Sequence, residues 1–308
     1  MESPGVQVRL CYVAGANHGG STLLALLLDQ HPGVVAVGEA GPIARVRSNS
    51  SYDCSCGDTL DRCTFYTAVA DRLRDRSIPF DPMDWQIRYE MPHSALDRLA
   101  FGLPPRGAVA LGRLRHAVLR HMPVTARMLE PIDQRNLAFA RAALEVADAQ
   151  LFVDATKVPE RARMLADLPA PLVVVHLIRD PRAVAFSGSR RGRDPVVIAQ
   201  YWKRTHDTLD AMERHLRCEG WITLRYEDLC ADPDAALRPV FQLVALEPIR
   251  VSRHFNGSGH HVVGNKMRRG ASQTVSQDDA WETGMAPEVM DAVWKRTRST
   301  AGRHGYEF

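Results

Sequence analysis

Lysine and cysteine are both scarce in this chain. Of the 39 lysine and arginine residues, the lysines are only Lys157, Lys203, Lys266 and Lys295. A lysine that falls inside a motif therefore carries unusual weight. The 6 cysteines are scattered over 308 residues, which excludes a small disulfide scaffold and favours a reducing cytoplasm.

Long apolar runs and a large net charge are also missing. No run approaches the roughly 20 apolar residues of a membrane-spanning helix, and the first residues lack the pattern of a secretory signal. A net charge of +3 excludes general electrostatic attraction for nucleic acid. We therefore expect a cytoplasmic protein, one domain over residues 1–308, with no membrane span and no nucleic-acid partner. The sequence leaves its oligomeric state, monomer or homodimer, open.

Apolar and β-branched runs alternate with stretches of helical composition. Strands are expected at residues 6–14, 33–37, 151–154, 172–178 and 221–226. Buried strands that alternate with helices predict an α/β fold, a P-loop-like parallel β-sheet flanked by helices on both faces. Ligands of such folds bind beyond the carboxyl ends of the strands. Residues 45–132 are rich in Pro, Gly and Arg and contain no convincing strand, so we expect a mainly helical cap insertion over that edge.

The segment GANHGGST, residues 15–22, follows the spacing of a phosphate-binding loop without its lysine. Gly15, Gly20 and Thr22 match G-x-x-x-x-G-K-[ST], while Ser21 stands at the lysine position. Backbone N–H groups of a glycine-rich turn and of the following helix bind an anion without any side-chain charge. The alternative is an ordinary strand-to-helix turn capped by Ser21 or Thr22.

A second anion motif is HLIRDPRAVAFSGSRRGR, residues 176–193. Arg179 ends a strand-like run, Pro181 opens a helix, and Ser187 lies two turns farther on. A guanidinium and a hydroxyl suit a phosphate group. The alternative is a surface pair of Arg179 with Asp180, with Ser187 facing solvent. Two anion sites at the ends of parallel strands suit a ligand with phosphates at both ends.

Together the two motifs resemble the sulfotransferases that use 3'-phosphoadenosine 5'-phosphosulfate (PAPS). The first loop of that family typically reads R-S-G-[ST]-T and binds the phosphosulfate, and residues 18–22 match it. The resemblance implies that Arg179 and Ser187 bind the 3'-phosphate. It also implies that the 5' end is bound by Asn17, His18, Gly19, Gly20, Ser21 and Thr22. His18 stands where the family usually has a cation, so it would act in catalysis either as imidazolium or as a neutral donor.

Other segments resemble further parts of bacterial sulfotransferases and of the tyrosylprotein branch. Residues 26–43 match a stretch that supplies the catalytic base, which implies this role for Glu39. Residues 154–161 match a stretch whose lysine reaches the oxygen that bridges sulfur and phosphorus, which implies that role for Lys157. Residues 260–270 imply that Arg268 and Arg269 also contact the 3'-phosphate, with a solvated basic turn as the alternative.

The resemblance implies transfer of the sulfuryl group from PAPS to a hydroxyl of a small molecule such as a natural product. The displacement would be in line, with adenosine 3',5'-bisphosphate as the leaving group, and would need no metal. A kinase-like phosphotransferase, which the missing loop lysine opposes, is one alternative. A peptide-tyrosine or glycan sulfotransferase is another, whereas a non-catalytic binding protein would need neither Glu39 nor Lys157.

The expected cap supplies candidates for the acceptor pocket. They are Trp85, Tyr89, His93 and His116, with core packing as the alternative for each. Cys54, Cys56 and Cys63 also lie in this segment, but their C-x-C…C spacing has no fourth ligand at a typical zinc distance. His93, His116 or His121 could approach them in space, and a disulfide or plain packing is open as well. We expect no metal site.

Overall fold

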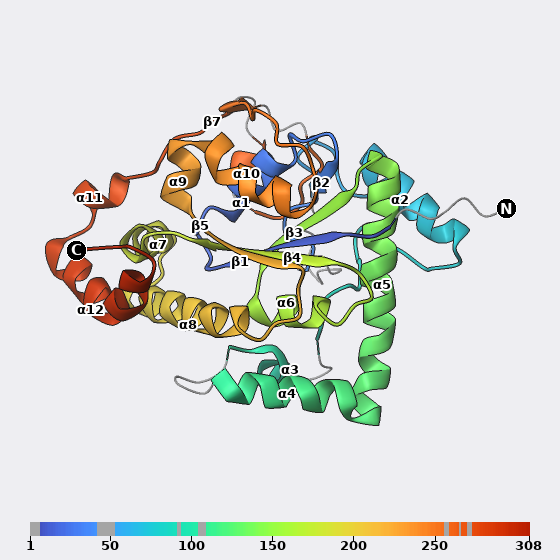
Figure 1. Cartoon of the computed structure of the whole chain (residues 1–308), viewed down its shortest axis with the longest axis horizontal. Coiled ribbons are helices and arrows are strands. Elements are labelled where there is room, and N and C mark those ends of the chain that lie inside the picture. The colour runs from blue at the N-terminus through green and yellow to red at the C-terminus, as the bar shows by residue number, and fades with distance from the viewer. Residues whose placement is uncertain are drawn as a thin grey trace.

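A five-stranded parallel sheet forms the centre of the molecule (Figure 1). The computed structural model describes residues 7–41, 53–90, 94–103, 109–255, 259–264, 266–269 and 273–308. The strand order is β2-β3-β1-β4-β5. The strands are β1 (Leu10–Gly15), β2 (Val34–Ala36), β3 (Leu151–Lys157), β4 (Leu172–Ile178) and β5 (Gly220–Arg225). The predicted fold class is confirmed, and each of the five predicted strands is present.

Helices cover both faces of the sheet, as expected (Figure 1). One face carries α1 (Ser21–Leu28), α9 (Tyr226–Ala231) and α10 (Pro233–Leu243). The other carries α5 (Pro123–Ala147), α6 (Pro159–Leu165) and α8 (Pro195–Glu213). The remaining elements are α2 (Thr64–Asp75), α3 (Ser94–Phe101), α4 (Val109–His121), α7 (Pro181–Ser189), β6 (His254–Phe255), the 3₁₀ turn η1 (Lys266–Arg269), β7 (Gln273–Thr274), α11 (Ala280–Gly284) and α12 (Pro287–Arg303).

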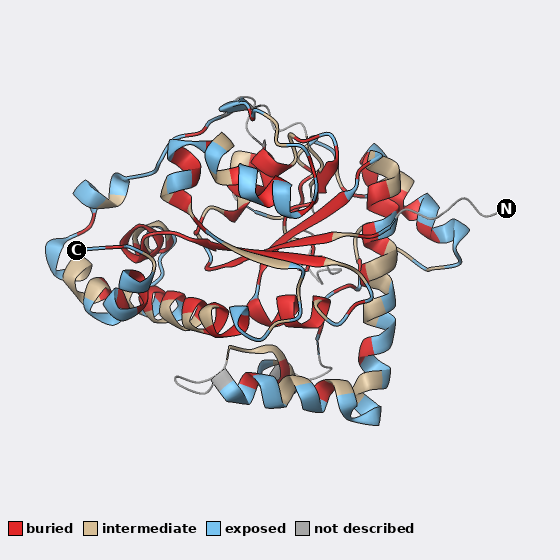
Figure 2. Cartoon of the chain, viewed as in Figure 1, coloured by how far each residue is buried: buried red, intermediate tan, exposed pale blue. Residues whose placement is uncertain are grey.

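The alternation of side chains along β1 divides the core into two halves. Leu10, Tyr12 and Ala14 pack toward α5 and α6, whereas Cys11 and Val13 pack toward α1 and α10. Strands buried on both faces appear as continuous buried ribbons in Figure 2. This is why β1, β2 and β4 are mostly apolar and do not alternate, whereas the partly buried β5 is less so.

The pairing of β1 brings three strand ends to one edge of the sheet. Gly15 at the end of β1 is paired with Leu177 near the end of β4. On the other side, Ala14 is paired with Lys157, the last residue of β3, after a shift in register. The loop after β1, the Arg179 segment after β4 and Lys157 therefore meet at the carboxyl edge.

The described part of residues 45–132 is helical and forms no strand of the central sheet. Its helix α2 packs against α5, and α3 and α4 lie beyond α6 in Figure 1. Trp85 is 1% exposed, and its ring contacts Tyr66 and Phe139 between α2 and α5. Its Nε1 donates to the Pro82 carbonyl (2.8 Å). The prediction that Trp85 faces the acceptor pocket is therefore wrong, because the core holds its indole ring.

Across the described ranges, every helix is either too short or too polar to span a bilayer.

Substitution of Phe139 tests the core between α5 and the sheet. Its ring lies 4.5 Å from Trp85 and 5.8 Å from Phe152, measured between centroids. We expect Phe139→Ala to lower the free energy of unfolding by about 3–5 kcal/mol, because it removes buried apolar surface and leaves a cavity. Urea denaturation measures this loss. The control Val124→Ala, on the exposed start of the same helix, should change it by less than about 0.5 kcal/mol. Equal effects of the two substitutions would contradict this account of the core.

Candidate active site

The loop after β1 leads directly into α1 and is shaped by Gly20. Gly20 is the N-cap of α1 with φ 94°, in the left-handed region. A Cβ at this position would lie 2.3 Å from Cδ2 of Tyr226, so only glycine fits. Neither Ser21 nor Thr22 occupies the capping position. The amides at the start of α1 are thus presented to a pocket rather than enclosed by a capping side chain.

A pocket of about 420 Å³ lies at the carboxyl edge. It is lined by Asn17, His18, Gly20, Ser21, Thr22, Leu23, Glu39, Lys157, Arg179, Ser187, Arg191, Arg193, Tyr226, Val263, Gly264, Met267, Ser276 and Asp278. Both predicted anion motifs and the three residues predicted to act in catalysis, His18, Glu39 and Lys157, therefore share one cavity.

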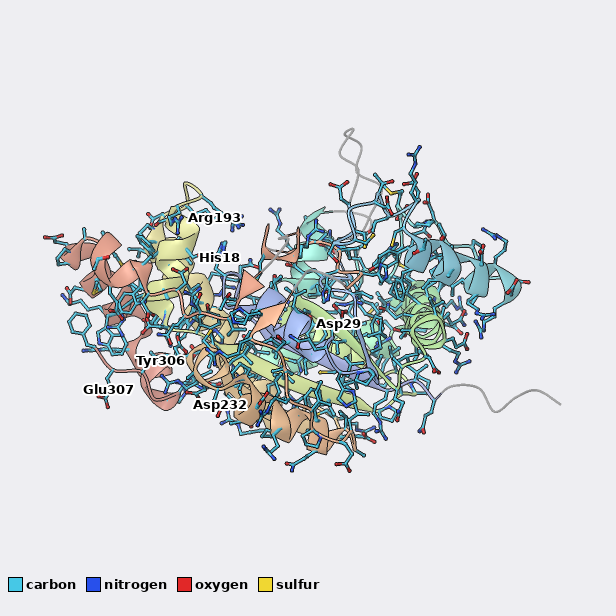
Figure 3. The ribbon with its side chains drawn as sticks, turned by 90° about the horizontal axis from the view of Figure 1, so that it is seen from above. His18, Asp29, Arg193, Asp232, Tyr306 and Glu307 are labelled. Atoms are coloured by element: carbon cyan, nitrogen blue, oxygen red, sulfur yellow. The ribbon has the colours of Figure 1, made fainter. Side chains whose placement is uncertain are left out.

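Two arginines of this pocket were missed by the sequence interpretation. Arg191 and Arg193 follow the end of α7 and line the cavity beside His18; Figure 3 labels His18 and Arg193 on this side of the molecule. The run SRRGR, directly after Ser187, is the signal that would have indicated them. Gly19, by contrast, is not among the lining residues, and its amide donates to the Ala16 carbonyl (3.2 Å).

Arg179 ties the loop to the end of β4. Its Nη1 donates to the His18 carbonyl (3.3 Å), and its Nη2 donates to the Asp278 carbonyl (2.7 Å). The guanidinium carbon lies 4.4 Å from the ring centroid of Tyr226, which adds a cation–π contact. Asp180 pairs with Arg182 instead (2.7 Å), so the alternative of an Arg179–Asp180 surface pair is wrong.

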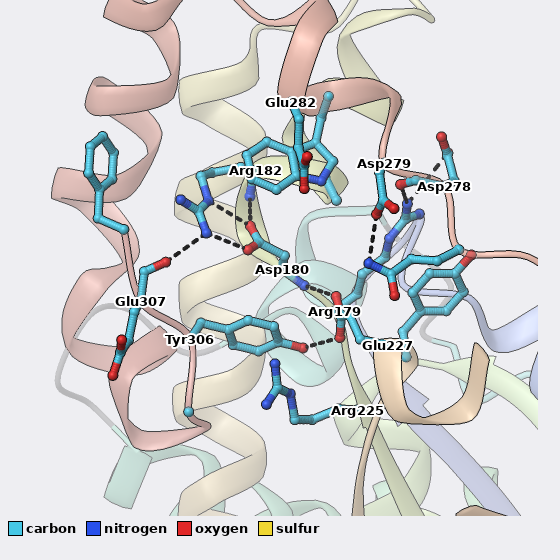
Figure 4. A pocket seen from close by; sticks show the side chains of 16 residues that line it. Arg179, Asp180, Arg182, Arg225, Glu227, Asp278, Asp279, Glu282, Tyr306 and Glu307 are labelled. Atoms are coloured by element: carbon cyan, nitrogen blue, oxygen red, sulfur yellow. Dashed lines mark hydrogen bonds and ion pairs between the residues drawn. The ribbon is translucent and has the colours of Figure 1, made fainter. Parts of the chain in front are cut away.

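A second cavity of about 330 Å³ adjoins Arg179 and is shown in Figure 4. Within it, Arg182 pairs with Asp180, and the Tyr306 hydroxyl donates to Glu227 (2.6 Å). Glu227 also accepts from the Asp180 amide (3.0 Å). These bonds brace the turn between β4 and α7, which follows Arg179.

Glu39 and Lys157 form an ion pair in the main pocket. Nζ of Lys157 lies 2.6 Å from Oε1 of Glu39, with side-chain exposures of 7% and 21%. Lys157 has φ 76°, a conformation that a non-glycine residue adopts at a cost of about 1–3 kcal/mol and that is common at functional sites. The partner of Glu39 thus lies at the carboxyl end of β3.

His18 is a neutral residue in this pocket at neutral pH. Burial lowers the pKa of its imidazole from 6.5 to about 4. Nearby positive charges act in the same direction; they belong to Arg191, Arg193, Lys157 and Arg179. A cation beside four others is unfavourable, so of the two roles expected for His18 the neutral donor is the one that the ligand-free pocket favours.

The late basic loop is the segment of residues 260–264 and 266–269. It contributes Val263 and Gly264 to the lining of the pocket, but not Arg268. Arg268 is buried, and its Nη1 donates to the carbonyls of Asp53 (2.8 Å) and His261 (3.3 Å). It does not line the pocket, so this arrangement does not support its predicted contact with the 3'-phosphate. Arg269 belongs to η1, and its side chain lies outside what the structure describes. Gly264 approaches the loop so closely that a Cβ there would lie 3.0 Å from Oγ1 of Thr22.

The acceptor candidates are separated by the fold. His116 pairs with Asp167 (2.9 Å) away from the pocket, because α4 directs it toward α6, and His93 lies outside the described residues. Tyr89 lines a third cavity of about 350 Å³. The other residues that line it are Gly41, Arg88, Asp97, Arg98, Phe101, Gly102, Thr156, Val158, Glu160 and Arg161.

Comparison with known proteins gives a structural match only. Neither a protein-family profile nor a curated protein matches this sequence. The structure resembles the sulfotransferase domain from the Synechococcus PCC 7002 olefin synthase, with a TM-score of 0.54 and 16% identity over 100% of this chain and 98% of that one. It also resembles the sulfotransferase domain from the curacin biosynthetic pathway, with a TM-score of 0.51 and 15% identity over 99% of each chain.

The fold and the pocket define a P-loop-like α/β protein. Its first loop has Ser21 where a nucleotide-hydrolysing phosphate loop has lysine. At sequence identities of 15–16%, these structural matches establish a shared fold and nothing finer. The chain therefore has the sulfotransferase fold, and the resemblance read from the sequence is confirmed at that level.

The pKa of His18 is open to direct measurement. We expect its ring resonances to titrate with a midpoint near the pKa of about 4 in the ligand-free protein, and NMR with labelled histidine, assigned with His18→Asn, measures this. Because the folded pKa lies below the unfolded value of 6.5, the unfolded state takes up the proton first as pH falls. This group therefore reduces stability progressively from about pH 6.5 down to about pH 4. A midpoint at or above 6.5 would contradict the neutral assignment.

Proposed function

We propose that this protein is a sulfotransferase that moves the sulfuryl group from PAPS to a hydroxyl of a small molecule. One observation carries the proposal. A glycine loop with open helix amides, a buried arginine with a serine, and a Glu39–Lys157 pair all line one pocket of about 420 Å³.

The two ends of the donor have separate places in this pocket. The amides at the start of α1, with Ser21 and Thr22, would hold the 5'-phosphosulfate, since a helix N-terminus favours negative charge. Arg179 and Ser187 would hold the 3'-phosphate. The carboxylate of Asp278 lies 3.4 Å from Nη2 of Arg179 and is 47% exposed, so the incoming phosphate would displace it. Arg191 and Arg193 add positive charge to the same wall.

The Glu39–Lys157 pair lies where the chemistry would occur. The acceptor oxygen forms a bond to sulfur while the bond from sulfur to the bridging oxygen breaks, and that oxygen leaves with adenosine 3',5'-bisphosphate. Glu39 takes the proton of the acceptor hydroxyl, and Lys157 donates to the bridging oxygen as negative charge develops there. The ligand-free ion pair holds both groups in position before the donor arrives.

The third cavity is the proposed acceptor site. Neither Glu39 nor Lys157 lines this cavity, but its lining includes Thr156 and Val158, the sequence neighbours of Lys157, and Gly41, two residues after Glu39. Tyr89, Phe101 and Val158 give it an apolar wall. A volume of about 350 Å³ with an apolar wall suits a small phenol or alcohol better than a glycan or a peptide chain.

Substitution of Glu39 tests the proposed base. We expect Glu39→Gln to lower kcat about 10²- to 10⁴-fold, because the amide accepts no proton, and to leave the affinity for adenosine 3',5'-bisphosphate nearly unchanged. Sulfuryl transfer from labelled PAPS and calorimetry with the bisphosphate measure the two effects. Glu130→Gln, on the exposed side of α5, is the matched control. Full turnover in the Glu39 variant would exclude it as the base.

Substitution of Arg179 tests the donor site. We expect Arg179→Ala to weaken binding of the bisphosphate by about 1.5–3 kcal/mol, the usual contribution of a charged hydrogen bond. The control is Arg190→Ala, an exposed arginine at the end of α7 that does not line the pocket. Calorimetry with the bisphosphate, and with ATP and Mg²⁺ for comparison, gives the affinities. Tighter binding of ATP with Mg²⁺ than of the bisphosphate would support a phosphotransferase instead.

A further inference from the structure

Three cysteines and a histidine converge beside the late loop. Among the residues that the structure describes, the Sγ atoms of Cys54, Cys56 and Cys63 and a ring nitrogen of His260 all lie within 4.8 Å of one another. Cys63 Sγ lies 3.2 Å from His260 Nδ1, and Cys54 Sγ lies 3.6 Å from it. Cys56 Sγ lies 3.6 Å from Cys63 Sγ. The fourth group that the C-x-C…C spacing lacked comes from about 200 residues away in the sequence.

These separations fit one tetrahedral ion. Zinc bonds of about 2.3 Å to sulfur and 2.0–2.1 Å to nitrogen require sulfur–sulfur separations of about 3.8 Å and sulfur–nitrogen separations of about 3.5 Å. Three of the six separations are 3.2–3.6 Å, close to these values, and all six are within 4.8 Å. They are far from the S–S bond of about 2.05 Å of a disulfide, and all three cysteines are free. A set of three thiolates and one imidazole selects zinc over the hard cations.

The surroundings hold each ligand in place. The turn after Cys54 is closed by the Gly57 amide, which donates to the Cys54 carbonyl (3.1 Å), and Gly57 has φ 103°. Cys63 is the N-cap of α2. The His260 ring stacks on Phe65 with centroids 4.8 Å apart and planes at 8°, and the Tyr66 hydroxyl donates to the His260 carbonyl. An imidazole whose ring plane and backbone are both fixed is typical of a metal ligand.

We propose that Cys54, Cys56, Cys63 and His260 bind one structural zinc ion. All four coordination positions are taken by protein atoms, which is the arrangement of a structural and not a catalytic site. The thiols lose their protons as the ion binds. This proposal does not rest on the proposed function.

The zinc ion links the insertion to the wall of the main pocket. Two residues after His260, the Val262 amide donates to the Val37 carbonyl (2.9 Å) and the Val262 carbonyl accepts from the Glu39 amide (3.4 Å). The next residues, Val263 and Gly264, line the pocket. The ion therefore fixes the backbone that faces both Glu39 and Thr22.

Metal analysis of the full chain, purified under reducing conditions with any affinity tag removed, tests the proposal. We expect elemental mass spectrometry to find about one zinc ion per wild-type chain. In Cys63→Ser and in His260→Gln, the zinc content should fall below about one tenth of an ion per chain. The matched control Cys218→Ser lies outside the cluster and should keep its zinc. Zinc retained in both ligand variants would overturn the assignment.

Two measurements on the wild-type chain keep the test independent of how the variants fold. Replacement of zinc by Co²⁺ should give the visible bands of a tetrahedral thiolate site. Removal of the metal by a chelator should speed hydrogen exchange at residues 259–264 and leave exchange at residues 172–178 unchanged. A wild-type chain that takes up neither metal, or that carries a disulfide within the cluster by mass spectrometry of alkylated peptides, would overturn the proposal.

Discussion

Parallel pairing of β1 between β3 and β4 is the constraint on which the site depends. Strand β1 pairs with β3 on one side and with β4 on the other, so the ends of the three strands cannot slide independently. The pairing of Gly15 with Leu177 fixes where the glycine loop lies relative to Arg179. The register shifts before Lys157, which has a left-handed conformation and whose ammonium contacts Glu39. The pairing of β1 therefore positions the glycine loop, Arg179 and Lys157 relative to one another.

The charge balance of the pocket follows from this geometry. Lys157, Arg179, Arg191 and Arg193 are brought together with few anions, and Glu39 and Asp278 compensate only part of their charge. The low pKa of His18 is a consequence, because a fifth cation in a partly buried site is unfavourable. A doubly anionic ligand would relieve this excess without a lysine in the loop.

The late loop is held from two directions. Hydrogen bonds join Val262 to Val37 and Glu39, and the cysteine cluster holds His260. Arg268, which the sequence suggested as a phosphate ligand, acts inside this arrangement by binding the carbonyls of Asp53 and His261. The loop therefore supplies the pocket with a rigid main-chain wall, and its buried arginine stabilises that wall.

The sequence by itself predicted the sheet, the glycine loop and part of the pocket lining, namely His18, Glu39, Lys157, Arg179 and Ser187, but not Arg191 and Arg193. Local signals sufficed for these, since strands buried on both faces are mostly apolar and a loop without room for side chains requires glycine, as at Gly20. Tertiary structure alone decided which distant side chains meet: Lys157 with Glu39, Arg179 with Asp278, and His260 with the three cysteines. It also placed Trp85 in the core and Arg268 under the loop. The physical reason is that composition and spacing report the local conformation of the chain, whereas contacts between segments up to about 200 residues apart depend on strand order and register.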